Sequence, residues 1–326
     1  MLETKNTVDT RRVLIYCIIA FLPAYLIALV IYLTGGLIDS PSLAAGLNLA
    51  LLLLIVYMLT PALAHILTRI ITREGWNNLY LRPKLKRGWL FWLLAWFGTP
   101  ALMGIGMLVY FLLFPQNFDP ELAVLREMLV SSGFDLDTLQ IPLAMLLLIQ
   151  TLQGVILAPI LNAIPILGEE FGWRAYLQPK LMPLGPRKAL VVTGIIWGLW
   201  HAPIIAMGYN YGNFDPNYWG APWSGIAMMT LGTIWLGIFF GWLTLKADSV
   251  WPAVVGHAVL NGTAAISLYM TRGTPLLLLG PTPVGLVGGI GFIAFALLIF
   301  SLPGAFRVKD VVSASEEVID LATEVD

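Results

Sequence analysis

Charged residues are scarce in this sequence. Asp, Glu, Lys and Arg make up only 11% of its 326 residues, while 58% are hydrophobic and the mean hydropathy is +0.82. Soluble globular domains hold about 25% charged residues. The scarcity of charge excludes an ordinary soluble domain and predicts that lipid is the main solvent of this chain. The lipid bilayer is therefore its first expected partner.

Cysteine and histidine are also rare. Cys17 is the single cysteine and lies in the first apolar stretch, which excludes both a disulfide within the chain and a zinc site made of cysteines. A bound metal would need ligands from the three histidines and from carboxylates. The net charge of -1 provides no basic excess, so no nucleic-acid partner is expected.

Long apolar stretches make up most of the remaining sequence. A helix needs about 20 apolar residues to cross a hydrocarbon core of ~30 Å. Eight stretches reach that length: 13–34, 45–67, 89–114, 141–167, 189–208, 224–245, 250–270 and 283–303. The pattern predicts an all-α, polytopic membrane bundle of about eight transmembrane helices. Since no linker or repeat divides it, we expect one transmembrane domain over residues 1–310 and an acidic C-terminal tail over 311–326.

The basic residues predict the orientation of this bundle, because cytoplasmic loops accumulate Lys and Arg. With eight spans, the loops on one side of the membrane hold only Arg126 and Arg272, so sixteen of the eighteen Lys and Arg residues fall on the other side. We therefore expect a multi-pass protein of the cell membrane with both termini in the cytoplasm.

Two adjacent carboxylates and a guanidinium interrupt the end of the fourth apolar stretch, as Glu169, Glu170 and Arg174. Left unpaired in lipid, three such charges would cost on the order of 7–10 kcal/mol. Glu170 and Arg174 are spaced i,i+4 and can pair along one helix face, whereas Glu169 lies about 100° round the helix. Glu169 is therefore free to act on a water molecule. A plain salt bridge at the helix end is the structural alternative.

Two of the three histidines lie within later apolar stretches, as His201 and His257, and Asn261 follows His257 at i,i+4. Such histidines also serve as hydrogen-bonding contacts between membrane helices. Three polar helix faces together favour hydrolysis of a peptide bond. In this interpretation Glu169 is the general base, His201 orients the water, and His257 with Asn261 stabilises the oxyanion.

These residues resemble the motifs of the CPBP family of intramembrane proteases, which includes CAAX prenyl endopeptidases, bacteriocin-processing enzymes and Abi proteins. The Glu-Glu-x-x-x-Arg motif corresponds to Glu169, Glu170 and Arg174, and the His-x-x-x-Asn motif to His257 and Asn261. The family's Phe-x-x-x-His motif corresponds to Trp197 and His201, with Trp in place of the usual Phe.

The resemblance covers residues 140–265, which we take as the catalytic core. It implies a helical membrane bundle with a conical catalytic cavity open toward the cytoplasm, in which the first glutamate of the motif activates the attacking water. The expected activity is that of an intramembrane endopeptidase acting on a membrane-associated or lipidated protein or peptide.

Several alternatives remain open from the sequence. Glu169, His201 and His257 could supply the three protein ligands of a catalytic zinc ion, which would make the chain a metalloprotease. An oxyanion hole that includes Asn261 favours catalysis without a cofactor. A scaffold or immunity protein of the same fold would bind a membrane partner without cleaving it. A secondary transporter is a further alternative hypothesis for the function, since intramembrane Glu, Arg and His also mark ion paths.

Overall fold

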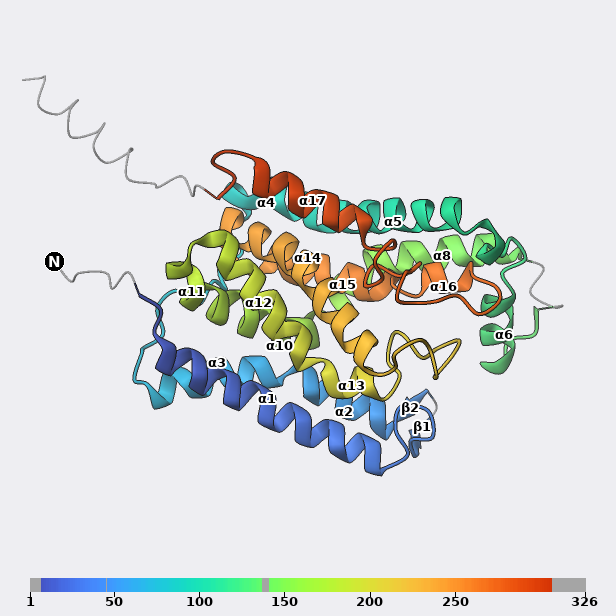
Figure 1. The fold of residues 1–326 in the computed structure, drawn as a ribbon, viewed down its shortest axis with the longest axis horizontal. Coiled ribbons are helices and arrows are strands. Elements are labelled where there is room, and N and C mark those ends of the chain that lie inside the picture. The colour runs from blue at the N-terminus through green and yellow to red at the C-terminus, as the bar shows by residue number, and fades with distance from the viewer. Residues whose placement is uncertain (1–6, 45, 137–140, 307–326) are drawn as a thin grey trace, which may run out of the picture.

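The chain folds as a bundle of helices (Figure 1), which confirms the predicted all-α membrane class. The computed structural model describes residues 7–44, 46–136 and 141–306, so the acidic tail predicted over 311–326 lies outside the described residues. Within the described ranges, the named strands are β1 (Ser42–Ala44) and β2 (Leu47–Asn48), which pair antiparallel.

The first half of the chain contains shorter helices than the hydropathy pattern alone predicts, joined into longer rods. Its helical elements are α1 (Thr10–Leu33), α2 (Leu49–Met58), α3 (Thr60–Ile71), α4 (Leu85–Leu93), the π-helix η1 (Leu94–Gly98), α5 (Thr99–Leu113), the 3₁₀ turn η2 (Pro115–Asn117) and α6 (Ala123–Ser131).

The second half carries the predicted motifs and is more interrupted. Its helical elements are α8 (Leu143–Ile156), α9 (Ala158–Leu161), α10 (Ala163–Gly172), the π-helix η3 (Trp173–Leu177), α11 (Gln178–Leu181), the 3₁₀ turn η4 (Met182–Leu184), α12 (Pro186–Trp200), α13 (Ala202–Ala206), α14 (Trp223–Ala247), α15 (Trp251–Thr263), α16 (Ile266–Tyr269) and α17 (Ile290–Ser301).

Four helical stretches among the described residues are long and apolar enough to cross a membrane: Thr10–Leu33, Leu49–Ile71, Gly88–Leu113 and Trp223–Ala247. Of the other predicted spans, three are broken and the last contains the single short helix α17. The α8–α9–α10 rod is interrupted next to Pro159 and just before Pro165, because proline cannot donate the backbone hydrogen bond of a continuous helix. The α12–α13 rod breaks at His201. The total of eight spans stays a prediction.

Helix α1 shows how this surface differs from that of a soluble protein. Its buried face is mostly small, with Ala20, Ala24 and Ala28 at i,i+4 spacing, whereas Leu22 and Leu26 are more than half exposed. Small residues allow close helix contact, and large aliphatic side chains are the ones that lipid solvates. The outer face of α1 is therefore built for lipid.

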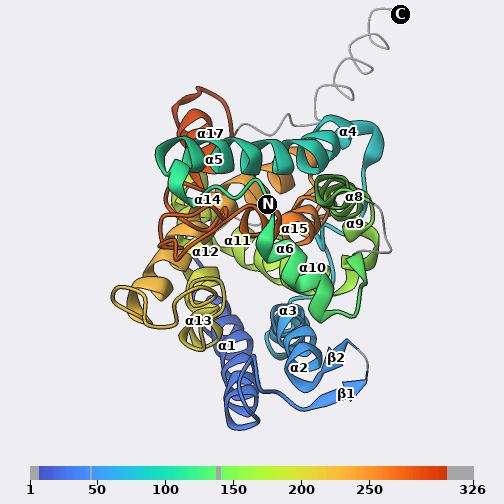
Figure 2. The same cartoon turned by 90° about the vertical axis from the view of Figure 1, so that its right-hand side faces the viewer.

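Helix α15 is the central element. It packs against α4, α5, α8, α9, α10 and α14, and residues 252–260 are all buried. Figure 2 views the molecule along its long axis and shows α15 and α10 near the middle, with α4 and α5 on one side and α1–α3 on the other. The His257 motif therefore lies in the interior of the bundle.

Contacts between loops define two ends of the bundle. At the first, which we call the basic end, the Val250 amide donates to the carbonyl of Tyr80 at 2.9 Å, and the indole of Trp251 donates to the carbonyl of Leu81 at 2.7 Å. This end holds the start of α1, residues 72–84 and α11. Most of the Lys and Arg residues belong to it.

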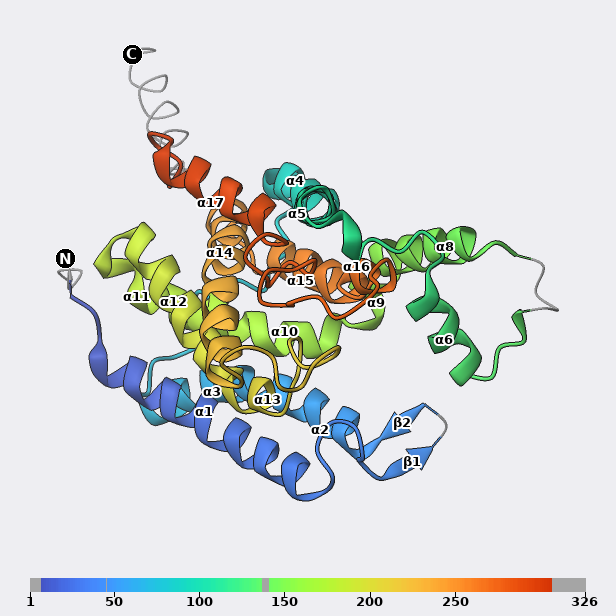
Figure 3. The ribbon, with the colours of Figure 1, turned by 45° about the vertical axis from the view of Figure 1, so that its right-hand side comes forward.

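The opposite end, which we call the far end, holds β1, β2, α6, α13 and α16 (Figure 1). Its loops are joined to one another by backbone hydrogen bonds, from Asp119 to Met270 and from Arg272 to Asn117, each of 2.9 Å. Figure 3 shows the long loop after α13 lying near the segment that precedes α17. The Tyr211 hydroxyl joins these two segments by donating to the carbonyl of Val284 at 2.9 Å.

Candidate active site

Glycine pairs bring the motif helices into close contact with their neighbours. In α10, a Cβ at Gly168 would lie 2.7 Å from the carbonyl oxygen of Met58, and one at Gly172 would lie 2.4 Å from the Cβ of Pro61. In α12, a Cβ at Gly194 would lie 2.6 Å from a backbone atom of α14. Spacing of small residues at i,i+4 is a typical device for close packing of membrane helices. This close packing fixes how α10 and α12 are rotated and placed along their axes, and so where the side chains between the glycines lie.

Glu169 on α10 faces Trp197 on α12. The indole Nε1 of Trp197 donates to Oε2 of Glu169 at 2.8 Å, and the glutamate is only 3% exposed. The bond orients one carboxylate oxygen and leaves Oε1 for another partner. Because Glu169 also lines a cavity beside the other motif residues, it has the position expected of a base that acts on water.

Glu170, the next residue, faces a different set of groups. Its Oε1 lies 3.1 Å from the guanidinium of Arg174 and accepts from Nδ1 of His257 at 2.8 Å. Glu170 and Arg174 are both fully buried. The predicted i,i+4 pair is therefore present, but it lies behind the cavity wall, and His257 belongs to it as well. Glu170 and Arg174 hold the site together rather than facing a substrate.

His201 caps the break between α12 and α13. Its Nδ1 donates to the carbonyl oxygen of Trp197 at 2.8 Å, which leaves Nε2 as the nitrogen available to other groups. The ring packs edge-on against Trp200, with 4.7 Å between ring centroids. His201 lines the same cavity as Glu169.

His257 is held from three directions. Its ring stacks on Phe240 at 5.5 Å and meets Trp197 edge-on at 5.3 Å, while Glu170 binds its Nδ1. Asn261 lies one turn further along α15, is exposed, and lines the cavity beside His257. The carboxylate contact at Nδ1 makes Nε2 the nitrogen of His257 that can act toward the cavity.

The cavity has a volume of about 370 Å³. Of the six predicted site residues, four line it: Glu169, His201, His257 and Asn261. They come from α10, from the α12–α13 break and from α15, so side chains distant in the sequence share one space. Residues that sequence reasoning did not assign to a site also line it, notably Tyr57, Asn210 and Asn213.

The zinc ligand set proposed from sequence does not fit this geometry. Among the residues that the structure describes, no group of three or more His, Cys, Asp and Glu side chains is arranged to hold a metal ion. Nδ1 of each histidine is bound to a separate acceptor, so only Nε2 of each is left for another partner in the cavity. We therefore derive no step through a metal.

The lining of the cavity can be compared with the two ends of the bundle. Its lining includes Asn210 and Asn213 from the loop after α13, and Leu268 from α16, all at the far end. The basic loops lie at the other end. Cytoplasmic termini, predicted from the cations, and a cytoplasm-facing cavity, implied by the family resemblance, both stay predictions.

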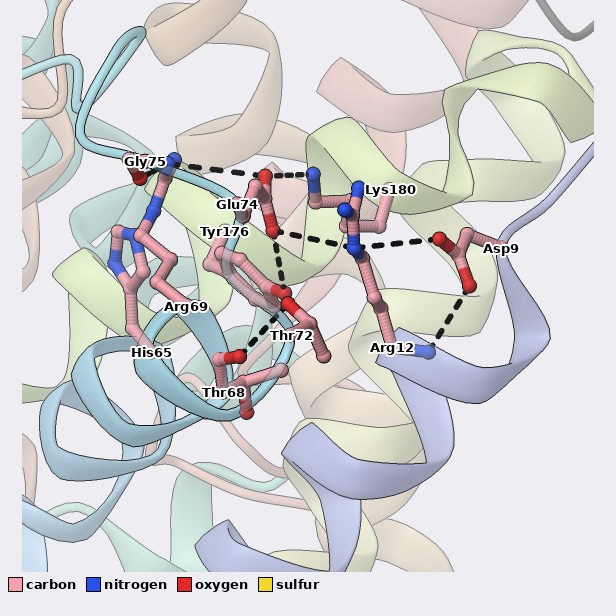
Figure 4. A network of polar contacts seen from close by, with 10 residues as sticks. All are labelled: Asp9, Arg12, His65, Thr68, Arg69, Thr72, Glu74, Gly75, Tyr176 and Lys180. Atoms are coloured by element: carbon pink, nitrogen blue, oxygen red, sulfur yellow. Dashed lines mark hydrogen bonds and ion pairs between the residues drawn. The ribbon is translucent and has the colours of Figure 1, made fainter.

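His65, for which the sequence predicts no partner, contacts α10, the helix that carries Glu169 and Glu170. Its Nδ1 donates to the carbonyl of Phe171 on α10 at 2.8 Å, and Nε of Arg69 donates to its Nε2 at 2.7 Å. The contact continues to Glu74 at the basic end (Figure 4). The i,i+4 spacing of His65 and Arg69 was the available signal for this pair.

Glu74 joins four elements at the basic end, namely α1, α3, η3 and α11. It accepts from the Tyr176 hydroxyl at 3.0 Å, pairs with Lys180, and lies 3.6 Å from Arg12 and 3.7 Å from Arg69 (Figure 4). Burial tends to raise the pKa of the Glu74 carboxyl, but the hydrogen bond and charge of Lys180, with the other cations, lower it below its ordinary value. The carboxylate form is therefore the one that the folded state stabilises.

Two comparisons with known proteins bear on this site. Residues 146–263 match the family model described as type II CAAX prenyl endopeptidase Rce1-like. The chain is also similar to a protein named CAAX prenyl protease 2 from Methanococcus maripaludis, with 24% identity over 245 residues that cover 74% of this chain and 81% of that protein. Both findings agree with the resemblance that the motifs predict and support an intramembrane endopeptidase in general.

Proposed function

From this similarity to CAAX prenyl endopeptidases, we propose that the chain hydrolyses a peptide bond of a membrane-associated or lipidated polypeptide through a water molecule activated by Glu169. The observation that carries the proposal is the meeting of Glu169, His201, His257 and Asn261 in one cavity inside an apolar bundle. The name of the archaeal relative makes a prenylated CAAX peptide the first substrate to test.

The proposed reaction consumes one water molecule. Oε1 of Glu169 takes a proton as the water oxygen forms a bond to the carbonyl carbon, and the carbonyl π electrons move to its oxygen. When the oxyanion collapses, the C–N bond breaks and Glu169 returns the proton to the leaving nitrogen. The products are a carboxylic acid and an amine.

The other site residues assist this sequence in distinct ways. His201 orients the water through Nε2, because its Nδ1 is already bound to Trp197. The amide of Asn261 and, in its protonated form, Nε2–H of His257 donate to the oxyanion. Glu170 fixes the ring of His257 through Nδ1, and Arg174 balances the charge of Glu170.

Glu169→Gln tests the proposal. The amide keeps the size of the side chain and removes the base, so we expect normal folded yield and a loss of cleavage of ~10²–10⁴-fold, typical of removing a general base. The assay uses purified protein in lipid vesicles and a peptide library with prenylated and unprenylated members, each with and without a chelator.

Other outcomes of that assay discriminate the alternatives. Wild-type rates for Glu169→Gln would remove Glu169 from the mechanism. Chelation that abolishes cleavage, with recovery on addition of zinc, would favour the metalloprotease reading. Binding of a peptide without cleavage by the wild-type protein under all conditions would favour a scaffold or immunity role.

The proposal includes a membrane topology. Eight spans with both termini in the cytoplasm are supported by the separation of the loops into a basic end and a far end, and by the positive-inside rule. It further includes one transmembrane domain over residues 1–310, with the catalytic core over 140–265.

A further inference from the structure

The helix that carries His201 is interrupted at this residue, where α12 ends and α13 begins. In a continuous helix, each carbonyl accepts from the amide four residues later. Pro203 has no amide hydrogen to donate to Leu199, and the Ile204 amide donates to the carbonyl of His201 at 3.1 Å instead of to that of Trp200. The carbonyls of Leu199 and Trp200 therefore lose their helical donors.

Two tyrosines from other helices donate to these carbonyls. The Tyr57 hydroxyl, from α2, donates to the carbonyl of Trp200, and the Tyr25 hydroxyl, from α1, donates to that of Leu199 at 2.8 Å. An unpaired carbonyl is costly in a hydrocarbon interior, because no water is there to replace the lost donor. The two hydroxyls therefore stabilise the interruption that places His201 in the cavity.

Tyr57 also contacts the cavity itself. It is 1% exposed and lines the cavity together with Glu169 and His201, whereas Tyr25 is 40% exposed and does not line it. The ring of Tyr57 packs against that of Trp200 with 4.3 Å between centroids, and Trp200 in turn meets the His201 ring edge-on at 4.7 Å. One side chain therefore contacts both the backbone before His201 and the ring beside it.

Thr60 holds the same tryptophan from the start of α3. The Trp200 indole donates to Oγ1 of Thr60 at 3.2 Å, and Thr60 is buried. Tyr57 and Thr60 are close in the sequence, so one stretch of chain contacts the residue before His201 through two side chains. Rotation of the Trp200 ring would break the bond to Thr60 and the contact with Tyr57.

We infer that Tyr57 is a positioning residue for His201. Its hydroxyl fixes the backbone at the α12–α13 break, and its ring fixes Trp200 against the imidazole, so that Nε2 of His201 is directed at the water in the proposed reaction. The inference deepens the proposed function and rests on it for the effect on cleavage. The control of His201 by Tyr57 rests on the contacts alone.

Histidine NMR tests the control of His201 without a cleavage assay. The chain has only three histidines, so isotopic labelling of histidine nitrogen gives few ring signals, and the set that disappears in His201→Ala belongs to His201. In Tyr57→Phe, purified in detergent, we expect the His201 signals to shift or broaden and those of the other two histidines to change less. Thr60→Val, which removes the acceptor of the Trp200 indole, makes the same prediction if Tyr57→Phe does not fold. Unchanged His201 signals in the folded variant would overturn the inference.

Steady-state kinetics test the effect on cleavage, with the library peptide that wild type cleaves fastest. Tyr57→Phe keeps the ring and removes the donor, so kcat should fall roughly 10-fold or more while KM changes little. Tyr110→Phe is the matched control, because Tyr110 is also 1% exposed, its hydroxyl accepts from Asn117 at 2.8 Å, and it does not line the cavity. This control should keep the wild-type kcat. Equal losses in the two variants would contradict a positioning role.

A double-mutant cycle shows whether Tyr57 acts through His201. If it does, adding Tyr57→Phe to His201→Ala should lower the residual rate by less than about twofold, because the positioned group is already gone. A second loss as large as that in the wild-type background would refute action through His201 and leave the protease intact. Absence of cleavage by the wild-type protein would overturn the proposed function and the kinetic part of this inference. The NMR comparison would still decide whether Tyr57 controls His201.

Discussion

Trp197 contacts four of the six predicted site residues. Its indole nitrogen binds Glu169, its carbonyl accepts from His201, its ring meets His257 edge-on, and the guanidinium of Arg174 lies 4.1 Å above its ring. The family motif usually has Phe at this position, which could keep the ring contacts but offers no donor to the glutamate. Trp197 is therefore a positioning residue for the proposed base.

Trp197→Phe isolates the indole donor. A hydrogen bond to a charged group contributes about 1.5–3 kcal/mol, so poorer positioning of Glu169 should lower kcat by roughly 10-fold or more, at 1.36 kcal/mol per factor of ten. We expect little change in KM. Steady-state kinetics on protein of matched folded yield measure both constants.

Trp96→Phe is the matched control for that prediction. Its indole donates to the carbonyl of Val155 at 2.7 Å, and Trp96 does not line the cavity. This variant loses an indole hydrogen bond of similar length without touching the site. Equal losses of kcat in the two variants would show that Trp197 acts through the stability of the fold and does not position Glu169.

At the scale of residues, sequence spacing could predict contacts within one helix and missed those between helices. The pairing of Glu170 with Arg174 follows from i,i+4 geometry. The bonds from Trp197 to Glu169 and from His257 to Glu170 depend on how α10, α12 and α15 are rotated against one another. The residue pattern of a single segment carries no information about how the helices are rotated relative to one another.

At the scale of helices, glycine sets the distance between α12 and α14. A Cβ at Gly198 would lie 2.5 Å from the Cα of Thr230, a backbone atom that can move only with its helix. Gly194 makes a similar contact one turn earlier. The two helices form the most extensive helix pair of the bundle, and this pair carries Trp197 and His201.

Gly198→Ala should force α12 away from α14. Overpacking of this kind costs about 1–3 kcal/mol, so we expect a lower thermal midpoint in detergent and a loss of cleavage as the cavity wall shifts. Gly104→Ala in α5 is the control, because a Cβ there meets no atom within 4 Å. It should match or slightly exceed wild-type stability, since alanine favours helix more than glycine. A tolerated Gly198→Ala would contradict the close contact.

The boundaries of the helices illustrate a second limit of the sequence. Hydropathy identifies α1 and α14 almost in full, because their apolar runs are unbroken. It merges α12 with α13, which are separated at His201, and α15 with α16, which are separated at Ala264 and Ala265. Pro159 and Pro165 were visible signals of the break before α10, and the structure has interruptions next to both. Hydropathy measures solvent preference and does not detect such breaks.

At the scale of the whole molecule, Glu74 ties the first and fourth predicted spans together at the basic end through Arg12, Tyr176 and Lys180. Its pKa is lower in the folded protein than its ordinary value of 4.5. A carboxyl of lowered pKa adds stability at pH values above its unfolded pKa, and that stability is lost as the pH falls through the folded value.

Glu74→Gln should therefore destabilise the protein near neutral pH and matter less in acid. Without the hydrogen bonds to the charged carboxylate, the free energy of unfolding should fall by ~1–3 kcal/mol at pH 7. We expect this loss to appear as a lower thermal midpoint. The difference from wild type should narrow as the pH falls from the ordinary pKa of 4.5 toward the lower pKa of the folded carboxyl, where the wild-type side chain also becomes protonated. Thermal unfolding in detergent from pH 7 to pH 3.5 measures it. A difference that is constant over this range would contradict the ionised role of Glu74.

The bond between Glu170 and His257 also orders events during synthesis. Glu170 and Arg174 leave the ribosome before α15 is synthesised. The Glu170 carboxylate can therefore pair with Arg174 but not with His257 until α15, the central helix, inserts. The cavity acquires His257 and Asn261 only at that moment. A chain truncated before α15 thus carries the proposed base with neither the proposed oxyanion donors nor a central helix, so the proposed hydrolysis could begin only when insertion of the chain is nearly complete.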